Sequence, residues 1–396
     1  MTERSPSLSE RIDLKYWAFR ALALVTPLAP LWLAQRIAVG AGTLAWACAP
    51  GLRRRAARNL AHIPALAADP VRLRWATRGV FIHAALNYLD FFRGRVVTYE
   101  ELARGWDIDG WEQIEQAARS GHGAILLGAH LGPYEYSMSK MSELGHPLLT
   151  PAERLRPERF FQLVTRLRDH HQARLLPADD RETLRELLNA LRNGQLAMFA
   201  IDRWVAGTSD AWPLFGEPAR LPTGPFALAA RSDAPVLLVL PWRVGLRRFG
   251  AVVELVTPER MPPADGATSA APSASAVQPS RQRSSDREAA IAQMRQRVYP
   301  ALERVISAHP EQWVSALSPI WDFPLEVEQT RQKAATMSAE ERGAEAKRER
   351  ASAPVNAPGA PTQTARASAA ASSRASSRTT WREQRRESRA PRVPRP

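Results

Sequence analysis

Residues 123–135 read GAILLGAHLGPYE, and this stretch decides the fold. Its first half is a continuous apolar run, which is typical of a strand buried on both faces of a parallel sheet. His130 follows the run directly, and Gly132 then precedes Pro133, a residue that suits the first position of a helix. The stretch therefore predicts a strand that carries a histidine to the carboxyl edge of a sheet, where open α/β sheets bind ligands.

The same alternation of apolar and amphipathic segments continues along the chain. Apolar runs predict strands at residues 124–129, 196–201 and 235–241. Helical spacing predicts helices between and after them, at residues 112–119, 134–144, 157–171, 180–193, 224–232 and 287–307. Helices that alternate with buried strands indicate an α/β fold, with a central, mostly parallel sheet flanked by helices.

The N-terminal region, residues 1–95, is predicted to be helical and to associate with a membrane. Residues 14–50 are apolar, but Arg20 and Arg36 interrupt them, and the charge-free runs are shorter than the ~20 residues that span a bilayer. Arginines gather immediately afterwards, within residues 53–58, which favours an anionic lipid surface. We expect helices that lie on the membrane; an ordinary buried helical hairpin with a solvated basic turn is the alternative.

Charge and composition define the rest of the organisation. The formal net charge of +14 indicates an anionic partner, and nine Arg against two Glu in residues 351–396 supply +7 of it. Low complexity predicts a disordered insertion at residues 262–286 and a basic tail, residues 324–396, that cannot bury a core. An α/β domain over residues 96–323 lies between the N-terminal region and this tail. Cys48 is the single cysteine, which excludes disulfides within the chain.

His130 and Glu135 are the first candidates for chemistry. An imidazole oriented by a carboxylate is a general base, and it can deprotonate a hydroxyl that attacks a carbonyl carbon. The backbone N–H groups near Gly132 are candidates to hold the developing oxyanion. A structural carboxylate at a helix start, beside an isolated histidine, would show the same spacing. Nucleophile-elbow, Walker and dinucleotide-binding motifs are missing from the sequence. No dense His/Asp/Glu cluster is present, so we expect neither metal nor cofactor.

Further blocks of sequence accompany the His130 stretch in a fixed order. Residues 152–159 read AERLRPER, residues 200–203 read AIDR, residues 214–225 read LFGEPARLPTGP and residues 309–313 read HPEQW. With residues 110–135, these blocks resemble the bacterial lipid A late acyltransferase superfamily. The likeness runs from about residue 14 to 323, and it is strongest to the branch of phosphatidylinositol mannoside acyltransferases.

The resemblance implies an O-acyltransferase with a glycerolipid-acyltransferase-like fold. The family's His-x4-acid motif maps onto His130 and Glu135, and Asp202 is a second carboxylate that could orient the ring. Which carboxylate does so stays open. The family's substrate-site Glu and Arg map onto Glu153 and Arg168, and its acidic-Arg pair after a strand maps onto Asp202 and Arg203. Arg168 and Arg203 are the candidates to bind anionic parts of a substrate. The motif acid is Asp in the mannoside branch and usually Glu in the lipid A branch, so Glu135 leaves the branch open.

The implied reaction is direct transfer of a fatty acyl group from acyl-CoA or acyl carrier protein to a hydroxyl of a membrane glycolipid. His130 is the expected base, and no covalent acyl-enzyme is expected. The expected location is the cytoplasmic face of the cell membrane, as a peripheral or monotopic protein. One alternative is a lysophospholipid acyltransferase with the same chemistry. Another is a non-catalytic protein that binds an anionic partner through its tail, although no nucleic-acid-binding module is recognisable and nucleic acid is not the expected partner.

Overall fold

The computed structural model describes residues 14–94, 96–98, 104–141, 148–154, 157–169, 173–232, 234–260 and 280–322. All of these belong to the first of two units into which the chain divides, Met1–Glu328. The second unit, Gln329–Pro396, lies outside the described residues. The predicted basic tail, residues 324–396, therefore stays a prediction, as does the part of the predicted insertion that precedes residue 280.

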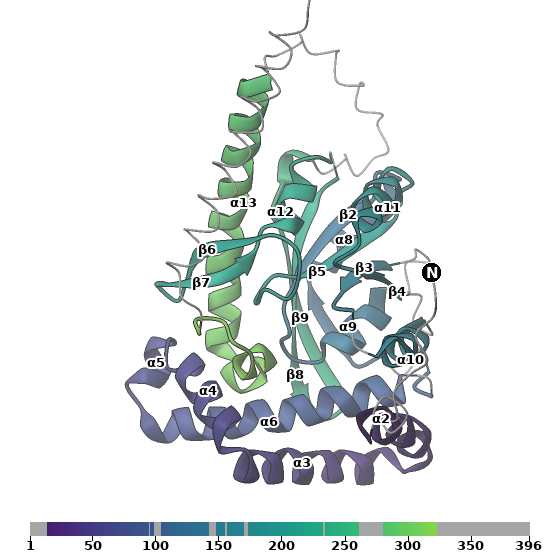
Figure 1. Cartoon of the computed structure of the whole chain (residues 1–396), viewed down its shortest axis with the longest axis vertical. Coiled ribbons are helices and arrows are strands. Elements are labelled where there is room, and N and C mark those ends of the chain that lie inside the picture. The colour runs from purple at the N-terminus through teal and green to yellow at the C-terminus, as the bar shows by residue number, and fades with distance from the viewer. Residues whose placement is uncertain are drawn as a thin grey trace, which may run out of the picture. The chain divides into compact units, whose positions relative to one another are not determined.

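A seven-stranded sheet forms the centre of this unit, in the order β1-β9-β8-β2-β5-β3-β4 (Figure 1). Neighbouring strands are parallel except for the antiparallel pair β8 and β9. The predicted strands correspond to β2, β5 and β8, and the prediction of a mostly parallel sheet flanked by helices is confirmed. The strands are β1 Trp106–Asp109, β2 Ala124–Gly128, β3 Leu148–Ala152, β4 Ala173–Pro177, β5 Leu196–Ala200, β8 Val236–Gly245 and β9 Arg248–Leu255.

Helices cover both faces of the sheet because alternate residues of a strand point to opposite sides. Ile125 and Leu127 of β2 belong to an apolar cluster with α11, α12 and α13, whereas Leu126 joins a second cluster with α8 and α9. This double burial is why β2 is a continuous apolar run. The helices are α8 Trp111–Arg119, α9 Tyr134–Met141, α10 Glu158–Asp169, α11 Arg181–Arg192, α12 Gly224–Ala229 and α13 Ser280–Ala308.

The beginning of α13 corrects the predicted boundaries of the insertion. The helix starts at Ser280, inside the segment 262–286 that composition predicted to be a disordered insertion. Its first turns are rich in Ser, Arg and Gln, which resemble a low-complexity segment in composition. These residues nevertheless extend a helix whose later part is fixed by packing, because elongating an existing helix is much easier than nucleating one.

The N-terminal helices form a layer beside the sheet, with α3 running along α6 (Figure 1). Asp69 caps α6, because its side chain accepts hydrogen bonds from the backbone N–H groups of Val71 and Arg72, both at 3.0 Å. None of the helices in the described ranges combines the length and the apolar character that spanning a bilayer requires. The elements are α2 Leu14–Val25, η1 Thr26–Leu28, α3 Leu31–Cys48, α4 Pro50–Leu60, α5 Pro64–Ala67 and α6 Pro70–Arg93.

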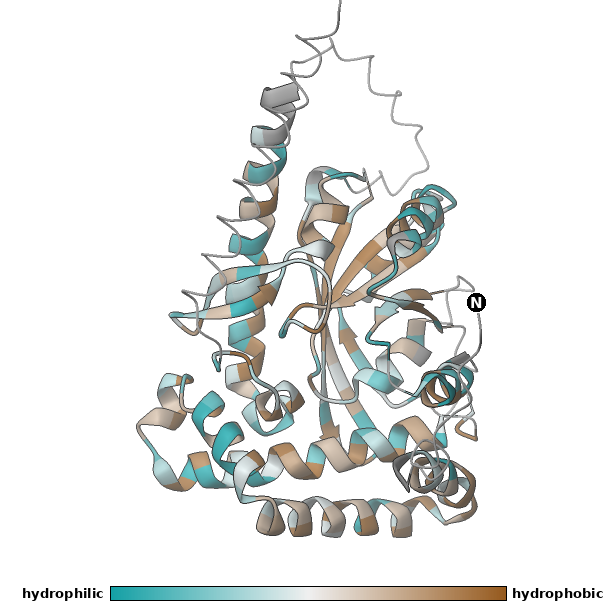
Figure 2. Ribbon diagram, viewed as in Figure 1, coloured by the Kyte–Doolittle hydropathy of each residue, from teal (hydrophilic) through white to brown (hydrophobic). Residues whose placement is uncertain are grey.

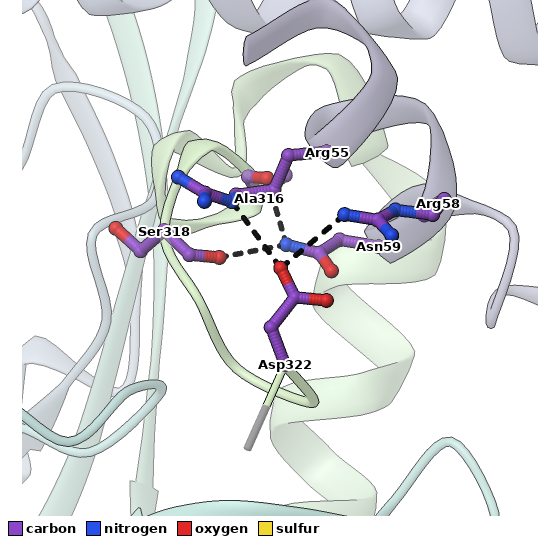
Figure 3. Close-up of polar contacts among 6 residues, drawn as sticks. All are labelled: Arg55, Arg58, Asn59, Ala316, Ser318 and Asp322. Carbon is purple, nitrogen blue, oxygen red and sulfur yellow. Dashed lines mark hydrogen bonds and ion pairs between the residues drawn. The ribbon is translucent and has the colours of Figure 1, made fainter. Parts of the chain in front are cut away.

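The last described segment is fastened to α4 (Figure 3). This segment contains η4 Pro310–Gln312 and η5 Val314–Leu317. The buried side chain of Asn59 donates hydrogen bonds to the carbonyls of Ala316 and Ser318, both at 2.8 Å. Asp322 accepts from Arg55 at 3.3 Å and from Arg58 at 3.4 Å at the surface. The buried contacts of Asn59 hold the segment more effectively than the exposed ion pairs, which contribute little in water.

A buried ion pair joins α6 to β8. The carboxylate of Asp90 contacts the guanidinium of Arg243, and both side chains are almost completely buried. Burial raises the pKa of Asp90, while the positive charge of Arg243 acts in the opposite direction. The backbone of Arg243 also exchanges two hydrogen bonds with the side chain of Gln312, at 2.7 and 3.0 Å. The pair therefore links the N-terminal layer, the sheet and the C-terminal segment.

Replacing one member of this pair is expected to destabilise the fold strongly. Arg243→Met leaves the Asp90 carboxylate buried without its counter-charge, which costs about 3–5 kcal/mol of the free energy of unfolding. Urea denaturation followed by circular dichroism measures this change. The double variant Asp90→Leu/Arg243→Met should recover much of the loss, because two apolar side chains can replace a buried pair. Equal stability of the single variant and the wild type would contradict the assignment.

Candidate active site

The register between β2 and β5 brings His130 and Asp202 together. The two strands are parallel, and Gly128 pairs with Ala200 at their carboxyl ends. His130 and Asp202 each lie two residues beyond this pair. Both side chains therefore lie at the same point of the carboxyl edge of the sheet. The Nδ1 atom of His130 lies 3.0 Å from Oδ1 of Asp202. Asp202, rather than Glu135, is thus the carboxylate that contacts the imidazole ring.

Asp202 is a buried anion with several hydrogen-bond donors. Its Oδ2 atom accepts from the backbone N–H of His130 and from the indole Nε1–H of Trp313, both at 3.0 Å. Burial alone raises the pKa of a carboxyl group, but the charge and hydrogen bond of His130 lower the pKa of Asp202 to about 2. An ionised Asp202 requires His130 Nδ1 to donate its proton, which leaves Nε2 with the lone pair that a general base needs.

Trp313 contacts this site, although it was not among the predicted site residues. Its side chain is completely buried. Its neighbours are tied to the histidine loop as well: the N–H of Val314 donates to the carbonyl of His130 at 2.9 Å, and the N–H of Gly132 donates to the carbonyl of Gln312 at 3.2 Å. The C-terminal segment therefore braces the His130–Asp202 pair from one side. No local sequence signal marks Trp313, because its role depends on a contact with Asp202 across 111 residues.

The loop at Gly132 differs from the prediction of an oxyanion site. The N–H of Gly132 is already bonded to Gln312, so the structure does not offer it to a substrate. Gly132 has a φ of +54°, and a Cβ atom at this position would lie 2.6 Å from the carbonyl oxygen of Pro241. Glycine is required here both by its conformation and by the close approach of β8.

Glu135 and Arg168 form an ion pair beside the histidine. The Nε atom of Arg168 lies 3.1 Å from Oε2 of Glu135, and its Nη2 atom contacts the other carboxylate oxygen. Desolvation lowers the pKa of Arg168, but the Glu135 carboxylate more than compensates and raises it. A bidentate pair of this kind fixes both side chains. The structure thus pairs Glu135 with Arg168, which lies on α10.

A cavity of about 610 Å³ contains His130 and all the predicted substrate-binding side chains, Glu153, Arg168 and Arg203. Glu153 is exposed at its wall, and its neighbour Arg154 pairs with Glu158 at 3.4 Å and Asp179 at 3.6 Å. Within the part of the chain that the structure describes, Glu153 and Arg203 make no ion pair. Both are therefore positioned to contact a polar ligand in the cavity.

The rest of the cavity wall is largely apolar. One part of it is formed by side chains that α2, α6, α10 and β4 contribute, namely Phe19, Phe91, Phe160, Phe161, Val164 and Leu175. Residues of the block at 214–225 lie on the wall as well, since Pro222, Gly224 and Pro225 line the cavity. Phe215 and Gly216 instead form the two-residue turn between β6 Ser209–Leu214 and β7 Glu217–Pro222, and Phe215 packs against Trp313. The cavity thus combines a histidine side chain with room for an apolar chain.

The sequence match to known proteins agrees with this combination. The model of a family described as bacterial lipid A biosynthesis acyltransferase matches residues 1–318. The chain belongs to this family. Its similar relatives include a phosphatidylinositol mannoside acyltransferase of Mycobacterium tuberculosis, 29% identical over 198 residues. Another, of Mycolicibacterium smegmatis, is 26% identical over 196 residues. Each match covers 49% of this chain, and 61% and 63% of the two relatives respectively.

Membership of the acyltransferase family confirms the resemblance on which the site residues were chosen. In this family member, the described residues contain no group of three or more His, Cys, Asp or Glu side chains that could hold a metal ion. The titratable side chains at and beside the cavity include the His130 imidazole, the Asp202 carboxylate, two arginines (Arg168 and Arg203) and two glutamates (Glu135 and Glu153).

Trp313→Phe should separate the hydrogen bond to Asp202 from the packing of the ring. The variant keeps an aromatic side chain but loses the N–H donor, and a hydrogen bond to a charged group contributes about 1.5–3 kcal/mol. We expect kcat for acyl transfer to fall about ten-fold with KM little changed, because the His130–Asp202 pair is less firmly positioned. Trp321→Phe is the matched control, since Trp321 packs on Trp313 but directs its N–H at the carbonyl of Glu217. Equal losses in both variants would contradict a specific role for Trp313.

Proposed function

We propose that this protein is an O-acyltransferase that moves a fatty acyl group from an acyl thioester to a hydroxyl of a membrane glycolipid. The observation that carries the proposal is the His130–Asp202 pair at the edge of a cavity with an apolar wall. The family match supports acyl transfer, and the names of the relatives favour a phosphatidylinositol mannoside-like or lipid A-like acceptor. Acyl-CoA and acyl carrier protein present the same thioester, and both are candidate donors.

The proposed reaction is a direct transfer. His130 Nε2 takes the proton from the acceptor hydroxyl as its oxygen attacks the thioester carbonyl carbon, and the buried Asp202 carboxylate stabilises the imidazolium that forms. The tetrahedral intermediate then breaks its carbon–sulfur bond. The leaving thiolate is the conjugate base of a thiol with a pKa of about 8.5, so it can depart readily and take the proton from His130. The products are the acylated acceptor and a free thiol, with no covalent intermediate on the protein.

The polar cavity residues are assigned to the substrates. Arg203 is the better candidate for an anionic group, because the guanidinium of Arg168 is already engaged by Glu135. Arg168 and Glu135 would then act as a fixed pair that shapes the cavity beside the base. Glu153, exposed at the wall, would accept hydrogen bonds from acceptor hydroxyls. The apolar wall around Phe91, Phe160 and Val164 would hold the acyl chain.

The proposed reaction is tested by comparing wild type with His130→Ala in mixed micelles. Palmitoyl-CoA and an acyl carrier protein thioester serve as donors, and a panel of glycolipids and lysophospholipids as acceptors. We expect the variant to lose about 10²- to 10⁴-fold in rate, the usual contribution of a general base. His122→Ala is the control, because His122 is exposed and lies outside the cavity.

The acceptor panel also decides between the candidate functions. If only lysophospholipids are acylated, the acceptor is a lysophospholipid and the glycolipid proposal is wrong. A wild-type protein that is inactive with every donor and acceptor would refute the proposed enzymatic activity. That result would favour the alternative, a protein that binds an anionic partner through its tail.

We further propose that α2, η1, α3 and the start of α6 form the surface that meets the membrane. Figure 2 shows that α3 is mostly apolar, whereas α11 and α13 carry many hydrophilic residues. Large apolar side chains are exposed on these elements: Trp17, Leu22, Leu24, Val25, Leu28, Trp32, Ile37, Leu44, Val71 and Trp75. Arginines lie over the tryptophans, with Arg20 above Trp17 and Arg36 above Trp32 at 5.4 and 5.7 Å. Exposed tryptophan and arginine together suit the boundary between lipid and water.

Leu28→Asp should weaken binding to vesicles. Leu28 is 83% exposed, and losing its burial in lipid is expected to reduce partitioning about ten-fold. Sedimentation with anionic and neutral vesicles measures this, and salt should weaken the anionic binding by screening. Ser285→Asp makes the same charge change at an exposed position of α13 and serves as the control. Unchanged binding of Leu28→Asp would remove this surface from the proposal.

A further inference from the structure

Asn87 carries a buried amide whose polar atoms find no hydrogen-bond partner among the described residues. It lies on α6, and its side chain is 3% exposed. Within the described part of the chain, neither Nδ2 nor Oδ1 makes a hydrogen bond. A buried amide without partners is costly, and an apolar residue of similar volume would avoid that cost. An asparagine at this position therefore lowers the stability of the fold, and no hydrogen bond within the described residues compensates for it.

Asn59 shows what a structural asparagine looks like in the same protein. It is 2% exposed, nearly the same as Asn87, but its Nδ2 atom donates to two carbonyls (Figure 3). That amide fastens α4 to the C-terminal segment. Two asparagines on neighbouring N-terminal helices thus have the same burial and opposite hydrogen-bond states, so burial alone does not explain Asn87.

Asn87 differs from Asn59 because it lines the cavity that contains His130. Tyr88 and Phe91 of the same helix line it too, as does Phe19 of α2. Nearby, Arg168 lies over the ring of Phe91 at 5.4 Å and is paired with Glu135. Asn87 thus lies in the cavity wall, and although its amide atoms are closed off in this structure, a turn of the side chain would bring them to a ligand in the cavity.

The chemistry of the side chain restricts the group that it can recognise. A carboxamide offers two donor hydrogens and one acceptor oxygen and carries no charge. An acyl chain cannot satisfy either function. The complementary partner is a neutral group that both donates and accepts a hydrogen bond, namely a hydroxyl or an amide. The acceptor glycolipid supplies hydroxyls, and the pantetheine arm common to both thioester donors supplies amides.

We propose that Asn87 is a specificity-determining residue that hydrogen-bonds a hydroxyl or amide group of a substrate bound in the His130 cavity. The assignment rests on the proposed function, since the same cavity holds the substrate. It also predicts an unusual separation of effects. Removing the amide should weaken substrate binding while the unliganded fold keeps or gains stability, because the unpaired polar atoms disappear.

The test compares Asn87→Leu with Asn59→Leu in the full chain. Melting temperature is measured without ligand, and KM is measured separately for palmitoyl-CoA and for the glycolipid acceptor identified with wild type. We expect Asn87→Leu to keep the wild-type melting temperature and to raise one KM about ten-fold, the effect of losing a substrate hydrogen bond. Asn59→Leu should lower the melting temperature. If Asn87→Leu does not fold, Asn87→Ala removes the amide without adding volume.

The substrate whose KM rises identifies the source of the recognised group: the donor for an amide, the acceptor for a hydroxyl. A fall in melting temperature with both KM values within two-fold of wild type would show that the amide is satisfied inside the fold, and it would overturn the assignment while the proposed function stands. A wild-type protein without acyl transfer would instead refute the proposed function and the assignment together.

Discussion

The buried carboxylate of Asp202 is the interaction on which the site depends. An anion withdrawn from water is stable only when donors surround it. The donors come from two distant parts of the chain, the loop after β2 and the indole of Trp313. Neither part is next to Asp202 in the sequence, so the charge is stabilised only when the sheet and the C-terminal segment have assembled. The same contacts fix the tautomer and the orientation of His130.

The need to hold that C-terminal segment explains several contacts far from the cavity. Asn59 anchors it to α4, and the side chain of Gln312 bridges it to the backbone of Arg243 on β8. Arg243 is in turn paired with Asp90 on α6. These buried polar contacts form a continuous brace from the N-terminal helices to the histidine loop. The geometry of a small site is in this way supported by residues from both ends of the described chain.

The N-terminal helices contribute side chains both to an exposed apolar surface and to the wall of the cavity. Trp17 and Leu22 of α2 are exposed, whereas Phe19 of the same helix lines the cavity. On α6, Trp75 is exposed near the start, and Asn87 and Phe91 line the cavity near the end. If the exposed face meets lipid as proposed, the same helices connect the membrane with the site. A lipid substrate could then reach His130 along helices that also set the polarity of the cavity wall.

Residues 123–135 by themselves determined the buried strand, the histidine at its end and the helix that follows, because these depend on local hydrophobicity and on the preferences of glycine and proline. The order and spacing of several short sequence blocks indicated the family. Strands β3 and β4 were missed although they are as long as β2 and β5, because their apolar residues are mixed with Pro, Thr and Arg and give no continuous apolar run. Only the tertiary structure decided that Asp202 contacts His130, that Glu135 pairs with Arg168 and that Trp313 belongs to the site. Strand order and register determine which side chains meet at the sheet edge, and these pairings are not encoded in any single segment.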